Sequence, residues 1–389
     1  MKGLYSKTII AAGVVLTLSG CGGGSSDSDS GAGATTLSGV FTDSPVKGLN
    51  YSCAPSGLSG VTTAGGIYEY EDGDSCTFSI GDVEIGSAVA DGVVSPIDLV
   101  SDSSPTDPTV VNIVQLLMML DDDGDPSNGI ELDGSSSTGA DFSAAVGGGT
   151  VDFSSATFDV DMDDVESSLG RTLPSDSDAE DHLTSSLSCA LSGAFTGTFS
   201  GDIAGNWGVV IDPESLEVYG AYSTHTSSFL MDGFGSPDNL LVLGGSNSFV
   251  SEGIDGEVFT GSLTDFNSAS GSWAGDADAG DFSGSRVDVS SIETPVYRVV
   301  GQCWGDFEVG IYSVEIDSSN NVEGTLYNPW DGELWNVTGT YNPGTDVLSF
   351  EYIGGFSGSV TFDPDTGDAD GTWADEGVVG TIRGHGCTL

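Results

Sequence analysis

The second half of the chain contains an internal duplication, and this feature narrows the possible folds more than any other. Gly271-Ser272-Trp273-Ala274 recurs as Gly371-Thr372-Trp373-Ala374. Likewise, Phe259-Thr260-Gly261-Ser262-Leu263 is matched by Phe356-Ser357-Gly358-Ser359-Val360. The matches keep their order and lie about 100 residues apart, as expected of a repeated structural unit. We therefore assign residues 189–292 and 293–389 to two copies of one unit.

Each copy consists of short runs that alternate apolar and small residues, separated by turns rich in Gly, Asp and Asn. This pattern predicts a meander of antiparallel strands with almost no helix. A meander must hide its edge strands, so we expect it to close as a barrel or to fold as a sandwich. The pattern leaves open whether the copies form one body of about twelve strands or two halves of about six.

Residues 37–188 precede the duplication and predict a β-module with a few packed helices. Short alternating runs separated by Gly-rich turns extend from Gly39 to Ala88 and predict strands. Asp107-Pro108 precedes a nearly continuous apolar run, which predicts a buried helix of about three turns. Weaker helices are predicted over Asp161–Leu169 and Ser175–Leu187, the latter opened by a capping box. The expected fold class is therefore mainly β, with a sandwich-like module, a few helices and a duplicated meander.

Part of this first module is similar to a known family. The segments Gly39-Val40-Phe41-Thr42-Asp43-Ser44-Pro45-Val46-Lys47-Gly48-Leu49 and Gly60-Val61-Thr62-Thr63-Ala64-Gly65-Gly66-Ile67-Tyr68-Glu69-Tyr70 resemble the carboxypeptidase-regulatory, or transthyretin-like, β-sandwich modules of bacterial surface proteins. The resemblance covers roughly fifty residues and implies a structural or display role, because such modules seldom carry catalysis.

The first residues have the order of a secretory signal. Lys2 and Lys7 precede an apolar run over residues 8–18, which is about half the length that a membrane-spanning helix needs. Leu18-Ser19-Gly20-Cys21 resembles the bacterial lipobox, which implies cleavage of residues 1–20 and attachment of diacylglycerol to Cys21. Residues 21–36 are small or polar after the cysteine and predict a flexible tether. Gly22 in place of aspartate implies, by the same resemblance, an outer-membrane lipoprotein with a periplasmic or surface-exposed body.

The chain is extremely acidic, with 7 Lys and Arg residues against 60 Asp and Glu residues and a formal charge of −53. Removal of residues 1–20 takes away two lysines and no acid, so the mature charge is −55. Nucleic acids and anionic lipids need basic surfaces, which excludes nucleic acid as a partner. The lipid bilayer is expected as a partner only through the acyl chains on Cys21.

Five cysteines remain after Cys21. Cys53 and Cys76 lie on neighbouring predicted strands of an exported protein, so we predict a disulfide worth about 3 kcal/mol. Cys189, Cys303 and Cys387 leave one thiol unpaired. A Cys303–Cys387 bond would staple the second copy on itself, whereas a Cys189–Cys387 bond would tie together the two ends of the duplicated region. We favour the first, and the unpaired residue stays open.

An acidic cluster directly follows the predicted buried helix and suggests calcium. Oxygen-bearing side chains recur at Asp121, Asp123, Asp125, Ser127 and Asn128. Alternating oxygen ligands at the end of a helix are typical of calcium loops. Pro126 replaces the turn glycine of an EF-hand and Leu132 its bidentate glutamate, so the alternative is a solvated acidic turn. We expect at most a weak calcium site.

Aromatic side chains of the second copy offer a possible sugar-binding surface. Tyr327, Trp330 and Trp335 lie around an Asn-Pro-Trp-Asp-Gly turn. Exposed rings beside carboxylates suit a glycan, because rings stack on sugar faces and acids accept hydroxyl hydrogen bonds. The alternative is that these rings fill the interior of the β-structure. Trp273 and Trp373, which are equivalent in the two copies, are expected in the core.

The sequence offers little for catalysis. Its three histidines, His182, His225 and His385, are scattered, and no nucleophile elbow, zinc motif or phosphate loop occurs. We therefore expect a non-catalytic surface lipoprotein that acts in binding, adhesion or display of a glycan or another surface protein. A glycan-binding protein and, less favoured, a two-carboxylate glycosidase are the alternatives.

Overall fold

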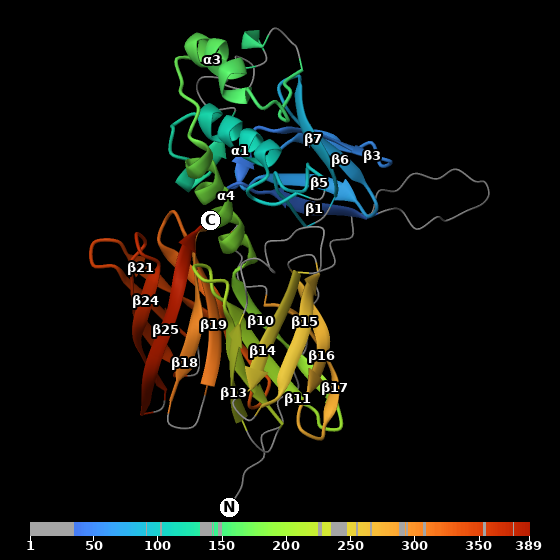
Figure 1. The fold of residues 1–389 in the computed structure, drawn as a ribbon. Coiled ribbons are helices and arrows are strands. Elements are labelled where there is room, and N and C mark those ends of the chain that lie inside the picture. The colour runs from blue at the N-terminus through green and yellow to red at the C-terminus, as the bar shows by residue number, and fades with distance from the viewer. Residues whose placement is uncertain are drawn as a thin grey trace, which may run out of the picture. The chain divides into compact units, whose positions relative to one another are not determined.

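A computed structural model describes residues 35–389 apart from short gaps. The gaps are at 91, 102, 133–141, 143, 147–149, 225–227, 235–246, 254–255, 265–266, 288–291, 293–294, 306–308, 353–354 and 376. The predicted signal peptide, Cys21 and most of the tether lie outside the described residues. Strands dominate the described part, and a few helices accompany its first module, which confirms the expected fold class (Figure 1).

The first module contains two small sheets that share one core. One sheet has the order β5-β1-β8 and consists of β5 (Ile67–Glu71), β1 (Thr36–Phe41) and β8 (Val93–Val94). The other has the order β4-β3-β6-β7 and consists of β4 (Ser59–Val61), β3 (Asn50–Ala54), β6 (Ser75–Ile80) and β7 (Val83–Val89). A short parallel pair joins β2 (Val46–Lys47) to β9 (Ile130–Glu131). Phe41 and Tyr68 of the first sheet and Phe78 of the second lie in one apolar cluster, as in a sandwich.

The described part contains three helices, of which α1 and α4 begin where the sequence predicts, whereas α3 begins three residues before the predicted Asp161. In α1 (Pro108–Leu120) the Asp107 carboxylate accepts a hydrogen bond from the Thr109 amide at 2.8 Å. α3 spans Phe158–Leu169, and α4 spans Asp176–Leu191 and opens with the capping box of Ser175 and Asp178. A short 3₁₀ turn, η1, covers Pro126–Asn128. None of the helices in the described part has both the length and the apolar character needed to cross a membrane.

The duplicated region forms two closed barrels of eight antiparallel strands each. The first barrel consists of β10 (Gly193–Gly201), β11 (Gly205–Ile211), β12 (Val218–Ser223), β13 (Ser228–Phe234), β14 (Asn247–Gly253), β15 (Val258–Thr264), β16 (Ser268–Ala274) and β17 (Ala279–Arg286). The second consists of β18 (Pro295–Trp304), β19 (Val309–Asp317), β20 (Asn321–Asn328), β21 (Glu333–Asn342), β22 (Val347–Glu351), β23 (Ser357–Phe362), β24 (Asp368–Asp375) and β25 (Val378–Thr388). Both expected strand counts are therefore wrong, because each copy closes on itself with two more strands.

In each barrel a glycine lies where a strand passes close to the indole ring of a tryptophan on the neighbouring strand. Gly380 lies opposite Trp373 in the β24–β25 ladder. A Cβ atom on Gly380 would lie 2.2 Å from the Trp373 indole nitrogen and 2.0 Å from the Trp304 carbonyl oxygen. Because no side chain fits there, glycine lets the indole lie flat against the neighbouring strand and donate to that carbonyl at 2.9 Å. The same bond in the first barrel joins Trp273 to the Ser200 carbonyl at 3.1 Å.

A buried apolar cluster joins the two barrels to each other. It comprises residues of β10, β11, β18, β19 and β20 and one residue that follows β17: Ala194, Val210, Val287, Val300, Ile311 and Tyr327. A second cluster continues from Val110 and Val114 of α1 and Leu187 of α4 into the interior of the first barrel. The end of α4 is thus packed as part of the barrel region rather than as a free linker.

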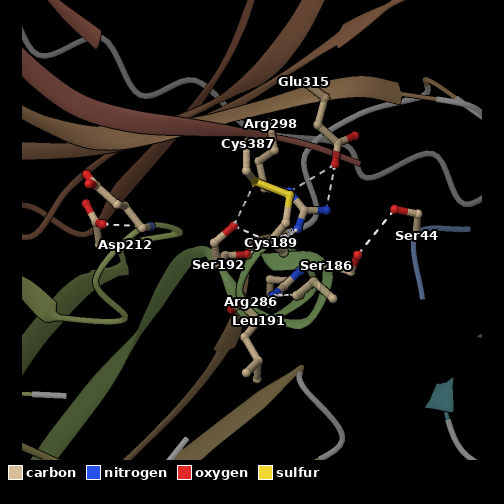
Figure 2. Close-up of a disulfide and its surroundings, with 12 residues drawn as sticks. Ser44, Ser186, Cys189, Leu191, Ser192, Asp212, Arg286, Arg298, Glu315 and Cys387 are labelled. Atoms are coloured by element: carbon tan, nitrogen blue, oxygen red, sulfur yellow. Dashed lines mark hydrogen bonds and ion pairs between the residues drawn. A yellow bond between two sulfur atoms is a disulfide. The ribbon is translucent and has the colours of Figure 1, made fainter. Parts of the chain in front are cut away.

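The disulfides correct one sequence prediction. Cys53 and Cys76 lie opposite each other on β3 and β6 and are bonded, which confirms that pair. Cys189 of α4 is bonded to Cys387 of β25, as Figure 2 shows. The favoured Cys303–Cys387 pair is therefore wrong. Cys303 is a buried free thiol, because its side chain points into the second barrel whereas Cys387 lies at the barrel end that meets α4.

Arginine side chains donate hydrogen bonds to the backbone carbonyls at the C-terminal ends of α1 and α4. Arg286 donates to the carbonyls of Ala190 and Leu191 at 2.7 and 2.8 Å. Arg298, which is paired with the Glu315 carboxylate at 2.9 Å, donates to the Cys189 carbonyl at 3.0 Å (Figure 2). These carbonyls have no partner within the helix, so one arginine from each barrel satisfies the last turn of α4. A third arginine, Arg171, similarly caps the carbonyl end of α1.

Candidate functional site

An apolar cavity of about 120 Å³ opens in the second barrel. Its lining comes from β18, β19, β20, β21 and β24 and from the segment between β22 and β23: Cys303, Gly310, Leu326, Asn328, Trp335, Tyr352, Phe356, Trp373 and Asp375. Eight-stranded barrels either fill their interior with side chains or leave room for one small ligand. The second barrel is therefore not completely filled by its side chains.

The strand registers explain why the second barrel is hollow. Trp273 and Trp373 occupy equivalent positions, since each lies opposite a glycine of the next strand, Gly280 or Gly380. Two residues after these glycines, on the same strands, lie Phe282 in the first barrel and Ile382 in the second. Phe282 pairs with Phe199 of β10, whereas Ile382 pairs with Cys303 of β18. On the strand that precedes each tryptophan, Phe259 of β15 lies opposite Trp273, whereas Gly358 of β23 lies opposite Trp373.

Three phenylalanines that surround the tryptophan of the first barrel are thus replaced in the second by cysteine, isoleucine and glycine. In the first barrel Phe199 lies 5.6 Å and Phe259 lies 6.3 Å from Trp273, between ring centroids. Among the described residues, these rings lie in the buried interior of the first barrel. In the second barrel Phe350 takes up the space beside Gly358, but no ring stands at Cys303. The loss of ring volume at Cys303 leaves the cavity open.

Four aromatic rings border the cavity and are held in fixed positions. Phe356 stacks on Trp373 with centroids 5.8 Å apart and planes 22° apart. Trp335 packs against Tyr352 at 6.0 Å. The hydrogen bond from the Trp373 indole to the Trp304 carbonyl fixes the first pair. A flat apolar group entering the cavity would meet ring faces and edges that are already ordered, which lowers the entropy cost of binding.

Polar groups of the cavity are few. The Asn328 side-chain oxygen accepts a hydrogen bond from the Trp330 amide at 2.9 Å, and Asp375 is the one acidic side chain of the lining. Burial raises the pKa of the Cys303 thiol far above its usual range. The thiol therefore stays protonated and acts as a small apolar side chain rather than as a nucleophile.

The predicted glycan platform is not assembled. Leu326 pairs with Trp335 and Tyr327 with Leu334 across β20 and β21, so Tyr327 and Trp335 lie on opposite faces of the sheet. Tyr327 is buried in the cluster between the barrels, which makes its assignment to an exposed platform wrong. Trp335 faces the cavity, and Trp330 is 44% exposed in the β20–β21 turn, where it stands apart from both.

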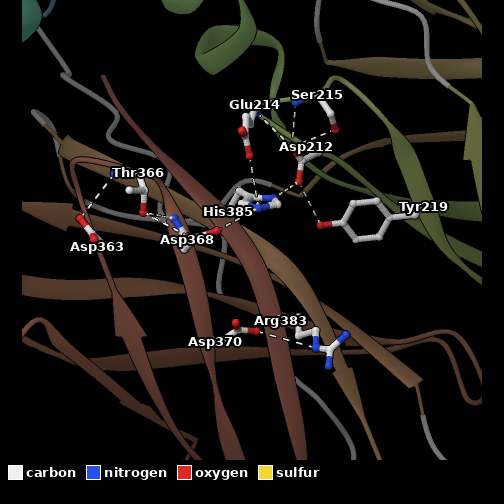
Figure 3. Close-up of polar contacts among 10 residues, drawn as sticks. All are labelled: Asp212, Glu214, Ser215, Tyr219, Asp363, Thr366, Asp368, Asp370, Arg383 and His385. Atoms are coloured by element: carbon white, nitrogen blue, oxygen red, sulfur yellow. Dashed lines mark hydrogen bonds and ion pairs between the residues drawn. The ribbon is translucent and has the colours of Figure 1, made fainter.

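A polar cluster centred on His385 joins the two barrels (Figure 3). The His385 Nδ1 atom lies 2.5 Å from an Asp212 carboxylate oxygen, and its Nε2 atom lies 3.4 Å from Glu214 and 3.5 Å from Asp368. Asp212 also accepts hydrogen bonds from the amides of Glu214 and Ser215, which close the turn after β11. An imidazolium at His385 therefore balances carboxylates from both barrels.

The pKa values of this cluster shift as expected for an ion pair. The hydrogen bond to Asp212 raises the pKa of His385, and the charges of Asp212, Glu214 and Asp368 add to this effect against partial burial. Burial alone would raise the pKa of Asp212, but the hydrogen bonds from His385 and from the turn amides outweigh it and hold that pKa below its usual range.

The raised pKa of His385 predicts a pH dependence of stability. Its contribution should be fully present below the unfolded value of 6.5 and should vanish as the pH rises through the higher folded value. We therefore expect the melting temperature of the wild type to exceed that of His385→Gln most at about pH 5.5, and the difference to shrink as the pH rises above 6.5. Melting curves of both proteins over this range test it, and a difference that grows with pH would contradict the ion pair.

The predicted calcium loop uses its side chains mainly to order itself. The Asp123 carboxylate accepts hydrogen bonds from the Asp125 amide at 2.9 Å and from Asn128 at 3.1 Å, and Asp125 accepts one from Ser127 at 2.6 Å. Asp121 is buried, and one of its carboxylate oxygens has no hydrogen-bond partner. A bound cation would satisfy that oxygen. However, no three acidic, His or Cys side chains of the described residues are grouped to hold a metal ion. Calcium at this loop stays a prediction.

The described histidines lie in separate environments. His182 of α4 is bonded to the backbone carbonyl of Asp43, and its Nε2 atom lies 3.5 Å from the buried Asp43 carboxylate. Burial raises the pKa of that carboxyl to about 7. His385 lies between the barrels, and His225 is outside the described residues. Neither described histidine contacts a hydroxyl or thiol that it could activate as a nucleophile.

Comparison with known proteins gives little further guidance. No family model and no curated protein matches the chain. Among solved structures, a protein of Nitrosomonas europaea provisionally named AttH matches 49% of this chain and 91% of its own, with 7% sequence identity and a TM-score of 0.19. A likeness this weak carries no argument about the function of the chain.

Proposed function

We propose that this protein is a non-catalytic binding protein whose second barrel takes up one small apolar group of a ligand. The observation that carries the proposal is the contrast between two duplicated barrels: the first has phenylalanines at described positions where the second has smaller side chains and a cavity. A gap retained in one copy of a duplicated core lowers stability unless something occupies it, because a cavity loses packing contacts.

The size and lining of the cavity define the ligand class. An apolar cavity of about 150 Å³ in another protein takes up benzene, so about 120 Å³ suits a single ring or a branched alkyl group of similar bulk. Asp375 in the lining favours a ligand with an O–H or N–H donor next to that group and disfavours a carboxylate or phosphate. Phenols, benzyl alcohols and indoles have this chemistry.

A binding screen tests this function. Residues 36–389, expressed without the lipid anchor, are titrated with phenol, benzyl alcohol and indole while the tryptophan emission and the melting temperature are recorded. Trp335 and Trp373 border the cavity, so a bound ring should change the emission. Binding to the folded state alone should add about 1.4 kcal/mol at a ligand concentration ten times Kd. If none of the three ring compounds changes either signal at millimolar concentration, the proposed function is wrong.

The cellular setting remains part of the proposal. The lipobox-like sequence supports anchoring of Cys21 in the outer membrane, with the periplasm or cell surface as the location of the barrels. The first module, with its disulfide and its resemblance to display modules, would hold the barrels away from the membrane. The strongly negative charge keeps such a body soluble and away from anionic headgroups.

Replacement of Cys21 tests the anchor. Diacylglycerol attachment requires the thiol, so Cys21→Ser should leave the protein unlipidated and move it from the membrane fraction to the soluble fraction. Fractionation followed by immunoblotting measures this, and Cys303→Ser is the matched control, because it removes a thiol that no lipid reaches. A Cys21→Ser protein that still sediments with membranes would show that another segment holds it.

A further inference from the structure

A polar groove of about 620 Å³ lies between the two barrels, on the outside of both. Its floor is formed by β18, β25 and β24 of the second barrel. The register places Gln302 beside Arg383 and Arg383 beside Asp370, so these three side chains form one row across the strands. Trp304 lies two residues beyond Gln302 on β18, and its side chain is therefore on the same face.

The wall of the groove comes from the first barrel. The turn between β11 and β12 contributes Asp212 and Ser215, and β12 contributes Tyr219, whose hydroxyl lies 3.4 Å from the Asp212 carboxylate. The ion pair of His385 with Asp212 joins this wall to the floor (Figure 3). The groove is thus built from both copies of the repeat and exists only where they meet.

The floor contains polar groups that are buried and unused. Gln302 is 5% exposed, and no hydrogen bond joins its side-chain amide to a described residue. Its residual exposure is toward the groove that it lines. The amide is not among the sealed polar groups that lack a partner and is therefore open to the water of the groove, and a bound hydroxyl group can replace that water as both donor and acceptor. The indole N–H of the half-buried Trp304 likewise has no partner among the described residues.

We propose that this groove is a second binding site, for a neutral saccharide. The indole of Trp304 offers a face on which a sugar ring can stack, and Gln302 and Asp370 offer a donor and acceptors for its hydroxyls. The carboxylates of the groove outnumber Arg383 and His385 and repel uronic acids, sialic acids and sulfated sugars. This site differs in place and ligand from the ring-binding cavity, and neither depends on the other.

The repeat itself supplies the test variant. Ser200 of the first barrel is equivalent to Trp304, because each carbonyl accepts the hydrogen bond of the equivalent indole. Trp304→Ser therefore removes the stacking ring and keeps the backbone bond to Trp373. Gln302→Met removes the hydrogen-bonding groups at nearly unchanged volume. Trp330→Ala is the control, since that ring is exposed but lies outside the groove lining.

The full mature chain with Cys21→Ser is screened on an array of neutral and anionic oligosaccharides, and affinities are measured by calorimetry with hexamers of glucose, xylose and N-acetylglucosamine. We expect a neutral hexamer to bind, Trp304→Ser and Gln302→Met each to weaken it about tenfold or more, and Trp330→Ala to leave it unchanged. The melting temperature of each variant shows whether it is folded. Binding of anionic sugars only, of no sugar, or of a neutral sugar that both folded groove variants retain would overturn the proposal.

Discussion

Removal of the Cys189–Cys387 disulfide is expected to lower the free energy of unfolding by about 5 kcal/mol in the chain-entropy account of cross-links. The bond closes a loop with a sequence separation of 198 residues, which includes nearly all of both barrels. Without it, β25 keeps its ladder with β18, and the last turn of α4 is joined to the barrels by the hydrogen bonds of Arg286 and Arg298 and by packing. The variant Cys189→Ser with Cys387→Ser tests this by unfolding in guanidinium chloride.

The first module supplies a matched control for this measurement. The Cys53–Cys76 bond closes a loop with a separation of only 23 residues, so its removal should lower the free energy of unfolding by about 3 kcal/mol. The double serine variant of that pair should therefore be the more stable of the two. An equal or smaller loss for the Cys189–Cys387 variant would mean that the barrels keep their arrangement without the cross-link.

Cys303→Phe is expected to abolish ring binding by the second barrel, with a loss of affinity of about a hundredfold or more because the new ring takes the place of the ligand. Phe199 fills the equivalent position of the first barrel, beside Trp273, so a phenylalanine at this position is compatible with the fold. The same change should raise the stability of the unliganded protein, since it fills a cavity. Titration with indole and thermal unfolding measure the two effects.

Cys303→Val is the matched control for this variant. Valine is close to cysteine in size and leaves most of the cavity open, so ring binding should stay within a few-fold of the wild type. If Cys303→Phe folds and binds indole as tightly as Cys303→Val does, the ligand lies elsewhere. If both variants lose binding, the thiol itself takes part, contrary to its assignment as an apolar wall.

Local signals in the sequence were sufficient to predict the helices and the strand-rich repeat. The N-cap at Asp107 and the capping box of Ser175 and Asp178 involve residues close in sequence, and both are present. Equivalent tryptophans at 273 and 373 indicated duplicated cores, and both are buried. The number of strands could not be predicted, because where a meander closes depends on pairing between its first and last strands.

Long-range pairing also explains the wrong disulfide. Cys189 lies at the end of α4, and its position next to Cys387 follows from the docking of that helix on the barrels, which no local pattern reports. Tyr327 was assigned to the surface because its neighbours form a turn. Its burial results from contact with the first barrel, through residues such as Val210 and Ile311. Side-chain alternation alone gives two faces and does not say which face a second domain covers.

The open barrel could have been found from the sequence by another route. The short sequence matches between the two copies align Phe259 with Phe356. The strand registers instead align Phe259 with Gly358. The shift of two residues keeps the same face but hides the loss of a ring beside Trp373. An alignment anchored only on Trp273 and Trp373 has an offset of 100 residues and sets Phe282 against Ile382 and Phe259 against Ser359, so it would have shown the loss of ring volume in the second copy.

The most direct test of ring binding in the second barrel is a crystal structure of residues 36–389 soaked with 4-iodophenol, whose iodine is located by its anomalous scattering. The iodine peak is expected between the paired rings of Phe356 and Trp373 and those of Trp335 and Tyr352, within reach of Cys303. The equivalent place in the first barrel, filled by Phe199 and Phe259, should show none. A soaked crystal with no peak in the second barrel, or with its peak in the groove at Trp304, would contradict the account.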